Sequence, residues 1–332
     1  MDEGSQHRPS AYELPIEDPS QKVVALAGGV GGAKLAWGLA QILPPTSLTI
    51  IVNVADDFEH LGLHISPDLD TVMYTLAGIV NPSTGWGVHN ETWSGMEMLA
   101  RYAAPTWFSL GDSDVTTHII RTMWLRQGFP LTWVTRELCK LLGVGHIVLP
   151  ATDNPVRTIV HTDLGALPFQ EWFVHHRWQP EVKSIEFQGM ETAEPSADAI
   201  AALRNADTIV FCPSNPYVSL DPILALPAVR RIISASNATK VAVTPIVGGK
   251  AIKGPAAKMM TEMNLAVSPT TVASHYQDLL TGFVLDSQDA DQQEEISETL
   301  GLATLVTNTV MRTSQDRVEL ANRVLEFAAG LL

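Results

Sequence analysis

The sequence is poor in positive charge. Its 332 residues include 21 Lys and Arg against 36 Asp and Glu, which gives a formal net charge of −15. A general nucleic-acid binder needs a basic footprint to displace counterions, so this class of function is excluded. The charge balance still allows a local cationic pocket for one phosphorylated small molecule.

Cysteine and long apolar runs are also scarce. Cys139 and Cys212 are too few for a disulfide framework or a zinc site, and their apolar neighbours predict core positions. No apolar run approaches the ~18 residues of a membrane span, so no membrane partner is expected. Residues 1–20 lack the layout of a signal peptide, and we expect a loose tail on a cytoplasmic protein.

The rest of the chain, residues 21–332, is predicted to form an α/β domain. Continuous apolar runs at 22–27 and 48–54 are typical of buried parallel strands, and a helical pattern at 33–43 lies between them. The alternation returns late in the chain and predicts a doubly wound, mostly parallel Rossmann-like sheet. The later strands are expected at 207–212, 240–246, 282–286 and 303–307, with helices at 196–205, 221–234, 255–263, 269–279 and 314–331.

The middle of the chain has a different pattern. Between about 68 and 145 the spacing predicts helices at 69–79, 91–102, 115–127 and 131–142 and no convincing strand. We therefore expect an inserted helical cap, rich in tryptophan, over the carboxyl ends of the sheet strands. A hairpin is expected just after it, at 146–161.

A glycine-rich segment follows the first predicted strand. The run Gly28-Gly29-Val30-Gly31-Gly32-Ala33-Lys34 allows a tight turn, and the helix after it offers free N–H groups to an anion. Lys34 stands where the dinucleotide fingerprint has its third glycine, and the Ser or Thr of a Walker A loop is missing. The segment predicts phosphate binding, with a purely structural turn as the alternative.

Carboxylates cluster after the second predicted strand. Asp56 and Asp57 end that strand, where open α/β sheets bind ligands, and Asp68 and Asp70 follow a short loop. One or two carboxylates can hold Mg²⁺ when water and phosphate oxygens complete its shell. For Asp68 and Asp70, the alternative is stabilisation of a helix N-terminus.

Polar residues in the cap are weaker candidates. Asp112, Asp114 and His118 lie at the start of a predicted helix, where capping by Asp112 or Ser113 is an equally good interpretation. His118 alone is more typical of a structural histidine.

Two late loops also carry polar groups. Ser214 and Asn215 stand between prolines after a predicted strand, in a rigid loop suited to reading a base or ribose. Lys250, Lys253 and Gly254 lie in a second loop before a helix. Cations concentrated at a strand-to-helix turn of so acidic a chain indicate a polyphosphate ligand.

Taken in order, these motifs resemble the 2-phospho-L-lactate transferase family, from about residue 23 to 326. The resemblance implies an Mg²⁺-dependent enzyme of coenzyme F(420) biosynthesis. Such an enzyme transfers a phospholactyl-type group from a guanosine diphosphate-linked donor to the ribityl hydroxyl of the deazaflavin Fo and releases GMP. The motifs are Gly28–Lys34, Asn53–Asp57, Gly62–Thr71, Leu110–Asp114, Pro213–Pro216 and Lys253–Pro255.

The resemblance also implies roles for the candidate residues. The catalytic pair would be Asp56 and Asp57, and the Mg²⁺ ligands would come from Asp56, Asp57, Asp68 and Asp70. Fo would contact Asp57, Trp86, His89, Asp112, Asp114 and His118, although relatives often carry Lys or Arg where His89 stands. The nucleotide and its phosphates would contact Gly29, Gly31, Gly32, Lys34, Ser214, Asn215, Lys250, Lys253 and Gly254. A homodimer is the candidate assembly.

Two other function classes compete with this interpretation. A non-catalytic nucleotide-sugar-binding regulator of the same superfamily would share the glycine-rich segment and the Asp56–Asp57 pair, but would lack the Ser66–Asp70 stretch and the aromatic cap. A nicotinamide oxidoreductase is disfavoured by Lys34. The donor acid stays open among phospholactate, phosphoenolpyruvate and phosphoglycerate.

Overall fold

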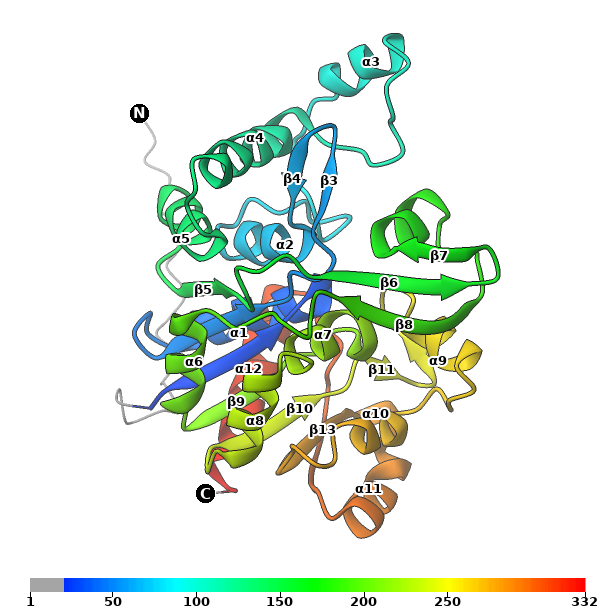
Figure 1. The fold of residues 1–332 in the computed structure, drawn as a ribbon. Helices are drawn as coiled ribbons and strands as arrows, with labels where there is room; N and C mark the ends of the chain where they lie inside the picture. The colour runs from blue at the N-terminus through cyan, green and yellow to red at the C-terminus, as the bar shows by residue number, and fades with distance from the viewer. Residues whose placement is uncertain (1–20, 332) are drawn as a thin grey trace, which may run out of the picture.

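A seven-stranded parallel sheet forms the centre of the molecule in the computed structural model, which describes residues 21–331 (Figure 1). Its strand order is β14-β13-β10-β9-β1-β2-β5, and every neighbouring pair is parallel. The predicted doubly wound, Rossmann-like fold is confirmed. The strands are β1 (Val23–Ala27), β2 (Leu48–Val52), β5 (Ile147–Pro150), β9 (Thr208–Phe211), β10 (Thr239–Val243), β13 (Gly282–Asp286) and β14 (Ala303–Thr307).

Helices cover both faces of this sheet. On one face α1 (Gly29–Ile42) packs against α2 (Pro67–Leu76) and α12 (Ser314–Ala329), and on the other α6 (Ala197–Arg204) packs against α8 (Pro227–Ala235) (Figure 1). Every residue of β1, β9, β10 and β13 is buried, as a sheet covered on both faces requires. This explains why β1 is a continuous apolar run and why the other three strands are mostly apolar.

The direction of strand addition reverses at β1. This strand pairs with β2 on one side and with β9 on the other, so the loops after β1 and β9 diverge at the carboxyl edge of the sheet. Open α/β sheets bind ligands in the crevice at such a reversal. The topology therefore favours a ligand site between Gly28–Gly32 and Pro213–Pro216.

Three local features differ from the sequence prediction. Helix α1 begins at Gly29 rather than at residue 33, so the glycines form its first turn. The helix predicted at 221–234 is divided into α7 (Asp221–Leu224) and α8, because Pro227 starts a new helix. The hairpin predicted at 146–161 is wrong, since β5 pairs parallel with β2 in the central sheet.

The strand after β5 belongs to a separate antiparallel sheet, which we call the arm. Here β6 (Arg157–Thr162) pairs with β7 (Gly165–Pro168) and with β8 (Val182–Gln188). The one-turn π-helix η1 (Glu171–His175) follows β7. Figure 1 shows the arm projecting from the side of the central sheet.

Residues 58–141 contain a short hairpin and four helices between β2 and β5. The hairpin pairs β3 (Phe58–His60) with β4 (Leu63–Ile65), and the helices are α2, α3 (Ser94–Arg101), α4 (Asp112–Arg126) and α5 (Leu131–Leu141). Helix α2 buries eight residues, whereas α3 buries none against the described part of the chain. Thus α2 belongs to the helical layer on the sheet, and α3 projects away from it (Figure 1).

The remaining elements complete the second half of the chain. They are η2 (Pro216–Leu220), β11 (Ile246–Val247), β12 (Lys250–Ala251), α9 (Ala256–Glu262), α10 (Pro269–His275), η3 (Ser287–Gln292) and α11 (Gln293–Leu300). Both cysteines are free and buried, as predicted, and burial raises the pKa of the Cys139 thiol to about 12.

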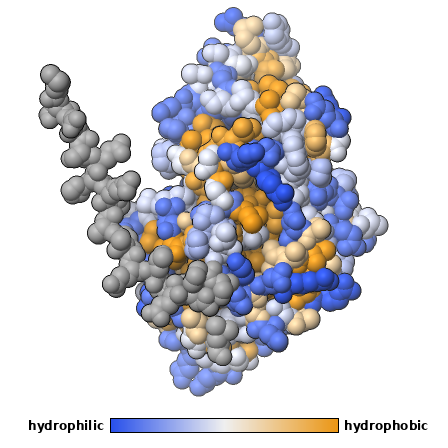
Figure 2. Space-filling view, turned by 90° about the vertical axis from the view of Figure 1, so that its left-hand side faces the viewer, coloured by the Kyte–Doolittle hydropathy of each residue, from blue (hydrophilic) through white to orange (hydrophobic). Residues whose placement is uncertain are grey.

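The surface carries both polar and apolar regions on the face drawn in Figure 2. No helix within residues 21–331 is long and apolar enough to cross a membrane. On the face in Figure 2, apolar surface gathers in the centre and the upper half of the molecule. The tail predicted at residues 1–20 lies outside the described residues.

Candidate functional site

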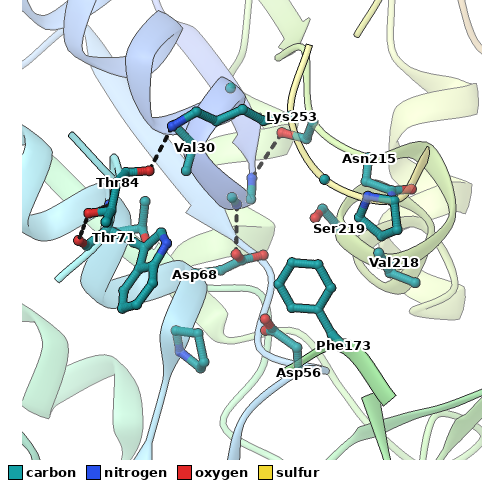
Figure 3. A pocket seen from close by; sticks show the side chains of 18 of the residues that line it. Val30, Asp56, Asp68, Thr71, Thr84, Phe173, Asn215, Val218, Ser219 and Lys253 are labelled. Atoms are coloured by element: carbon teal, nitrogen blue, oxygen red, sulfur yellow. Dashed lines mark hydrogen bonds between the residues drawn. The ribbon is translucent and has the colours of Figure 1, made fainter. Parts of the chain in front are cut away.

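A cavity of about 590 Å³ lies at the strand-order reversal. Its floor is formed by Gly28, Gly29 and Gly31 after β1 and by Pro213 and Ser214 after β9. Figure 3 labels their sequence neighbours Val30 and Asn215. Its walls come from α2, α4, the arm and the loop before α9. Predicted site residues that line it are Gly29, Gly31, Lys34, Asp56, Asp68, Asp70, Trp86, Asp114, His118, Ser214, Asn215, Lys253 and Gly254.

The glycines allow an unusually close approach of backbone segments. Gly29 has a φ of +60°, which favours glycine, and its N–H donates to Asp68 Oδ1 at 2.6 Å. The N–H of Gly28 donates to Ser214 Oγ at 3.1 Å. Gly32 lies behind the floor, where a Cβ would stand 2.4 Å from Ser214 Oγ. Its role is therefore close packing rather than ligand contact.

Two lysines bring positive charge to the rim of the floor. Lys34 Nζ donates to the carbonyl of Met311 at 2.8 Å, and Lys253 Nζ donates to the carbonyl of Thr84 at 2.7 Å. Burial and then the neighbouring cations Arg317 and Lys253 lower the pKa of Lys34. Lys250 is exposed on β12 and does not line the cavity, so the structure separates it from the other two lysines.

An acidic cluster of Asp56, Asp57 and Asp68 lies beside the floor. Asn53 Nδ2 donates to both Asp56 Oδ1 and Asp68 Oδ2, at 3.1 Å each, and Gln170 Nε2 donates to Asp56 Oδ2 at 3.2 Å. Burial, followed by the charges of Asp68 and Asp57, raises the pKa of Asp56 well above its usual range. Burial likewise raises the pKa of Asp68 to about 6. The cluster therefore holds more negative charge than its surroundings neutralise.

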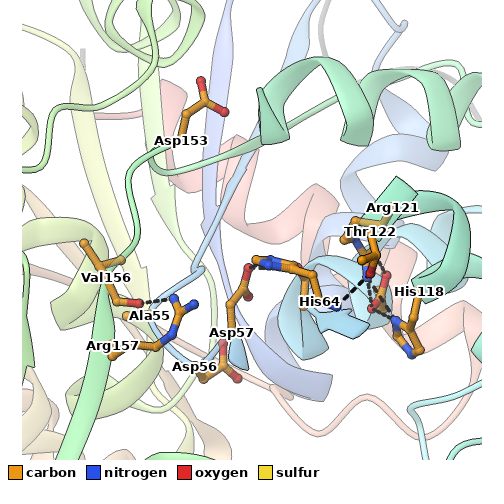
Figure 4. A network of polar contacts seen from close by, with 12 residues as sticks. Ala55, Asp56, Asp57, His64, His118, Arg121, Thr122, Asp153, Val156 and Arg157 are labelled. Carbon is orange, nitrogen blue, oxygen red and sulfur yellow. Dashed lines mark hydrogen bonds and ion pairs between the residues drawn. The ribbon is translucent and has the colours of Figure 1, made fainter. Parts of the chain in front are cut away.

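Asp57 is turned away from the cavity floor and does not line the cavity. Its Oδ2 accepts from Ser66 Oγ at 2.8 Å and lies 3.0 Å from His64 Nε2 (Figure 4). Its Oδ1 is buried and has no hydrogen-bond partner within the described residues. Asp57 thus keeps one unused acceptor beside Asp56.

Asp70 belongs to a different network, between α2 and α4. Buried Arg121 forms an ion pair with Asp70 and donates from the other terminal nitrogen to its Oδ2 at 3.0 Å. Arg121 also lies 3.1 Å from His118 Nδ1, and His118 Nε2 lies 3.4 Å from Asp114 Oδ1. Because Arg121 already neutralises Asp70, the structure argues against Asp70 as a metal ligand.

Asp114 is the second acid of this network, and like Asp70 it lines the cavity. Tyr74 donates its hydroxyl proton to Asp114 Oδ1 at 2.8 Å. Although burial raises the pKa of Asp114, hydrogen bonding and charge from His118 bring it below its usual value. Asp114 and His118 both line the cavity, and Asp114 brings a carboxylate to it.

Two further cap residues are not brought into the cavity. Asp112 is an N-terminal cap for α3, where it accepts from the N–H groups of Ser94 and Gly95. His89 is exposed, with its Nδ1 3.0 Å from the Ile79 carbonyl oxygen. Neither lines the cavity, whereas Trp86 does, at 49% exposure.

The loop after β9 leads directly into η2. Asn215 Oδ1 accepts from the N–H of Tyr217 at 3.0 Å and so caps η2. Ser214 and Asn215 both line the cavity, beside the lysine rim.

Sequence reasoning missed the aromatic side of the cavity. Phe169, Gln170, Phe173 and Trp178 line it from the arm and the segment after it. The signal was present as five apolar or aromatic positions within 169–178, but these residues lie more than 100 positions beyond the acidic cluster in sequence. Only the fold brings them to Asp56.

The acidic cluster is the part of the cavity that suits a divalent cation. Asp56 and Asp68 share one amide donor, and Asp57 Oδ1 has no partner, so oxygen acceptors are in excess. Hard cations prefer such oxygen ligands. Within residues 21–331, no group of three His, Cys, Asp or Glu side chains is already arranged as a complete metal site, so water and phosphate would have to complete the shell.

Comparison with known proteins agrees with this geometry. Residues 23–322 match the family model described as 2-phospho-L-lactate transferase CofD. A phosphoenolpyruvate transferase of Streptomyces griseus is 40% identical over 313 residues, covering 92% of this chain and 98% of that protein. The Mycobacterium tuberculosis protein of the same name is 40% identical over 296 residues, covering 82% and 89%.

A solved structure supports the fold. A member of the UPF0052 family from Bacillus halodurans aligns with a TM-score of 0.60 at 17% identity, covering 92% of this chain and 98% of that one. The family model spans nearly all of the described residues, including both halves of the cavity floor. The chain therefore belongs to the 2-phospho-L-lactate transferase CofD family.

Proposed function

We propose that this protein is an Mg²⁺-dependent transferase of coenzyme F(420) biosynthesis. It moves a phosphorylated three-carbon acid from a guanosine diphosphate-linked donor to the ribityl hydroxyl of Fo and releases GMP. The observation that carries the proposal is the cavity itself, where two lysines and a helix N-terminus face an acidic cluster with unneutralised charge. Family membership supports the transferase class, and the two substrates are part of this proposal.

The donor diphosphate belongs at the lysine rim. Lys34 and Lys253 line the cavity near the start of α1, where the positive end of the helix dipole favours an anion. Ser214 and Asn215 stand next to this rim and would contact the guanosine. Lys250 and Gly32 take no part in this binding because neither lines the cavity.

The reaction is a substitution at the phosphorus distal to guanosine. The ribityl oxygen of Fo forms the new O–P bond, and the bond from phosphorus to the bridging oxygen breaks, so GMP leaves with that electron pair. The hydroxyl proton passes to a carboxylate of the acidic cluster. Catalysis then consists mainly of positioning and of neutralising phosphoryl charge.

The cluster offers the groups for both tasks. Asp56 and Asp68 are the residues that would hold Mg²⁺, which when bound neutralises charge on the phosphate oxygens. Asp57 keeps a free Oδ1 and is held through Oδ2 by Ser66 and His64. Because it lies beside Asp56 and does not line the cavity, it would accept the hydroxyl proton through one intervening water. Asp114 and His118 would contact Fo on the opposite wall.

Phosphoenolpyruvate is the donor acid that the relatives favour. Two relatives at 40% identity carry the name phosphoenolpyruvate transferase. The test is to incubate the purified protein with Fo, Mg²⁺ and, separately, the phosphoenolpyruvyl, phospholactyl and phosphoglyceryl donors, and to follow products by mass spectrometry. We expect fastest turnover with the phosphoenolpyruvyl donor. Saturable nucleotide binding without turnover of any donor would instead support the non-catalytic regulator.

A further inference from the structure

Three aromatic residues form one wall of the cavity, which we call the aromatic wall: Phe169, Phe173 and Trp178. The rings of Phe169 and Phe173 are stacked, with centroids 5.3 Å apart and planes 7° apart, and the Phe173 and Trp178 rings lie 5.2 Å apart. Phe169 is buried, Phe173 half-buried and Trp178 39% exposed. The wall thus runs from the core to the cavity mouth, with Phe173 in the middle.

Phe173 is held firmly in place by its chain neighbour. Trp172 is completely buried and donates its Nε1–H to the Pro180 carbonyl at 3.0 Å, and Lys258 Nζ lies 5.8 Å from the centre of its ring. Because both residues belong to the single turn of η1, anchoring Trp172 fixes where Phe173 points. Figure 3 shows the Phe173 ring extending toward the cavity between Asp56 and Val218.

The wall is also joined to the acidic cluster. Gln170 stands between Phe169 and Phe173 in sequence and donates to Asp56 Oδ2 at 3.2 Å. Lys253 lies away from the wall, on the opposite side of Asp68 in Figure 3. The acidic cluster therefore lies between the lysine rim and the aromatic wall.

We propose that Phe173 is the stacking platform for the planar ring of the acceptor, and that its ring contacts with Phe169 and Trp178 support it. This rests on the proposed function, in which the acceptor carries a flat tricyclic ring on a ribityl chain. With the ring on Phe173, the chain extends toward the acidic cluster, and its hydroxyl meets the donor phosphorus held at the cationic rim. Stacking on an aromatic side chain recognises the flat face of a ring and needs no hydrogen bonds from it, so it suits a large fused ring.

The test compares Phe173→Leu, which keeps bulk and removes the aromatic face, with Phe173→Tyr, which keeps the face. Phe187→Leu is the matched control, because Phe187 lies on the same arm but outside the cavity. Fo binding is followed by fluorescence titration and GDP binding by calorimetry, with thermal unfolding as the check on folding. We expect Phe173→Leu to weaken Fo binding by roughly tenfold or more, the scale of a lost stacking contact. Phe173→Tyr and Phe187→Leu should stay within about twofold.

Each remaining outcome has a distinct meaning. If Phe173→Leu weakens GDP and leaves Fo unchanged, the platform holds the guanine and the inference is wrong. If Fo binding is equal in wild type and Phe173→Leu, the acceptor ring lies elsewhere and the inference is again wrong, although the proposed function stands. If wild type binds GDP but shows no saturable binding of Fo, with or without Mg²⁺, the proposed function fails, and this inference fails with it.

Discussion

Gly31 lies directly against Pro213, so close that a Cβ at position 31 would stand 2.1 Å from the Pro213 carbonyl oxygen. The two residues come from the loops after β1 and β9, on either side of the strand-order reversal. The absent side chain therefore sets how closely the two halves of the cavity floor approach each other.

Replacing Gly31 by Ala should destabilise the protein. The new methyl group meets backbone rather than a movable side chain, so the floor has to widen at a cost of about 2 kcal/mol or more. Chemical denaturation measures the change in the free energy of unfolding. Gly145→Ala is the control, because its Cβ meets nothing closer than Pro45 Cγ at 3.6 Å. Equal stability of both variants would contradict the close approach.

Lys253→Ala should weaken GDP binding by roughly tenfold or more, because a charge-assisted hydrogen bond to phosphate is worth about 1.5–3 kcal/mol. Lys34→Ala should act in the same direction. Lys250→Ala is a matched control three residues away, since its side chain is exposed outside the cavity. Calorimetric titration with GDP decides the matter, and a loss confined to Lys250→Ala would place the diphosphate elsewhere.

Asp57→Asn should lower turnover by roughly 10²-fold, the usual scale of lost acid–base assistance, with metal-free GDP affinity nearly unchanged. Asp56→Asn should also lower turnover, but raised Mg²⁺ should partly restore it, because that variant loses a metal ligand rather than a base. Steady-state rates across an Mg²⁺ series distinguish the two. Near-normal turnover in both variants would show that the pair is structural.

Because of the acidic cluster, the free energy of unfolding of the metal-free protein should fall as the pH rises. Asp68 has a pKa of about 6 in the folded protein, against about 3.9 when unfolded. Between these values the folded state binds a proton that the unfolded state has lost, so the stabilisation present below about pH 4 disappears as the pH passes 6. The pKa of Asp56 is raised as well, which extends the fall to higher pH.

Urea denaturation in EDTA should show this loss, on the order of 1–3 kcal/mol between pH 4.5 and 7.5. Asp56→Asn should reduce it, and excess Mg²⁺ should restore stability at pH 7.5 but not at pH 4.5. Asp198→Asn serves as control, since Asp198 is an exposed acid paired with Arg136. A wild-type profile identical to that of Asp56→Asn would contradict the coupling within the cluster.

Arg121→Leu should destabilise the protein by about 3–5 kcal/mol, because it leaves the buried Asp70 carboxylate without its partner. Adding Asp70→Asn should recover part of the loss by removing the unpaired charge. In contrast, Arg136→Leu breaks a pair whose side chains are 55% and 52% exposed, and should cost no more than about 1 kcal/mol. A double-mutant cycle by denaturation measures both couplings.

The sheet could be predicted from the sequence because its strands are buried on both faces. Strands such as β1 and β2 are uninterrupted apolar runs, and the glycines and carboxylates after them mark their carboxyl ends. The arm could not be predicted in this way. Only Val182 of β8 is buried and the rest of the strand is exposed or half-buried, and its pairing with β6 joins residues 20 to 31 positions apart.

Side-chain direction limited the prediction of the site. Lys250 and Lys253 are equivalent in a sequence pattern, but the short β11–β12 pairing exposes the first and the loop after it brings the second to the cavity. Asp112 looked like a cap for its own helix and in fact caps α3, eighteen residues earlier in the chain. Which helix Asp112 caps and which lysine reaches the cavity depend on tertiary contacts, and these cannot be inferred from the spacing of residues in the sequence.

The arm leaves and rejoins the central fold at nearly one point. Thr152 and Pro195 form an isolated bridge, and Thr152 Oγ1 donates to the Glu194 carbonyl at 2.5 Å. Residues 153–194 therefore form an inserted segment whose two ends lie side by side. Insertions, deletions or replacement of this whole segment would leave the strand order of the central sheet unchanged, because none of its strands belongs to that sheet. In terms of the proposed function, the segment that carries Phe173 can change while Lys34 and Lys253, which lie outside it, stay the same. For an engineer, residues 153–194 are the segment to graft when a different ring system is wanted.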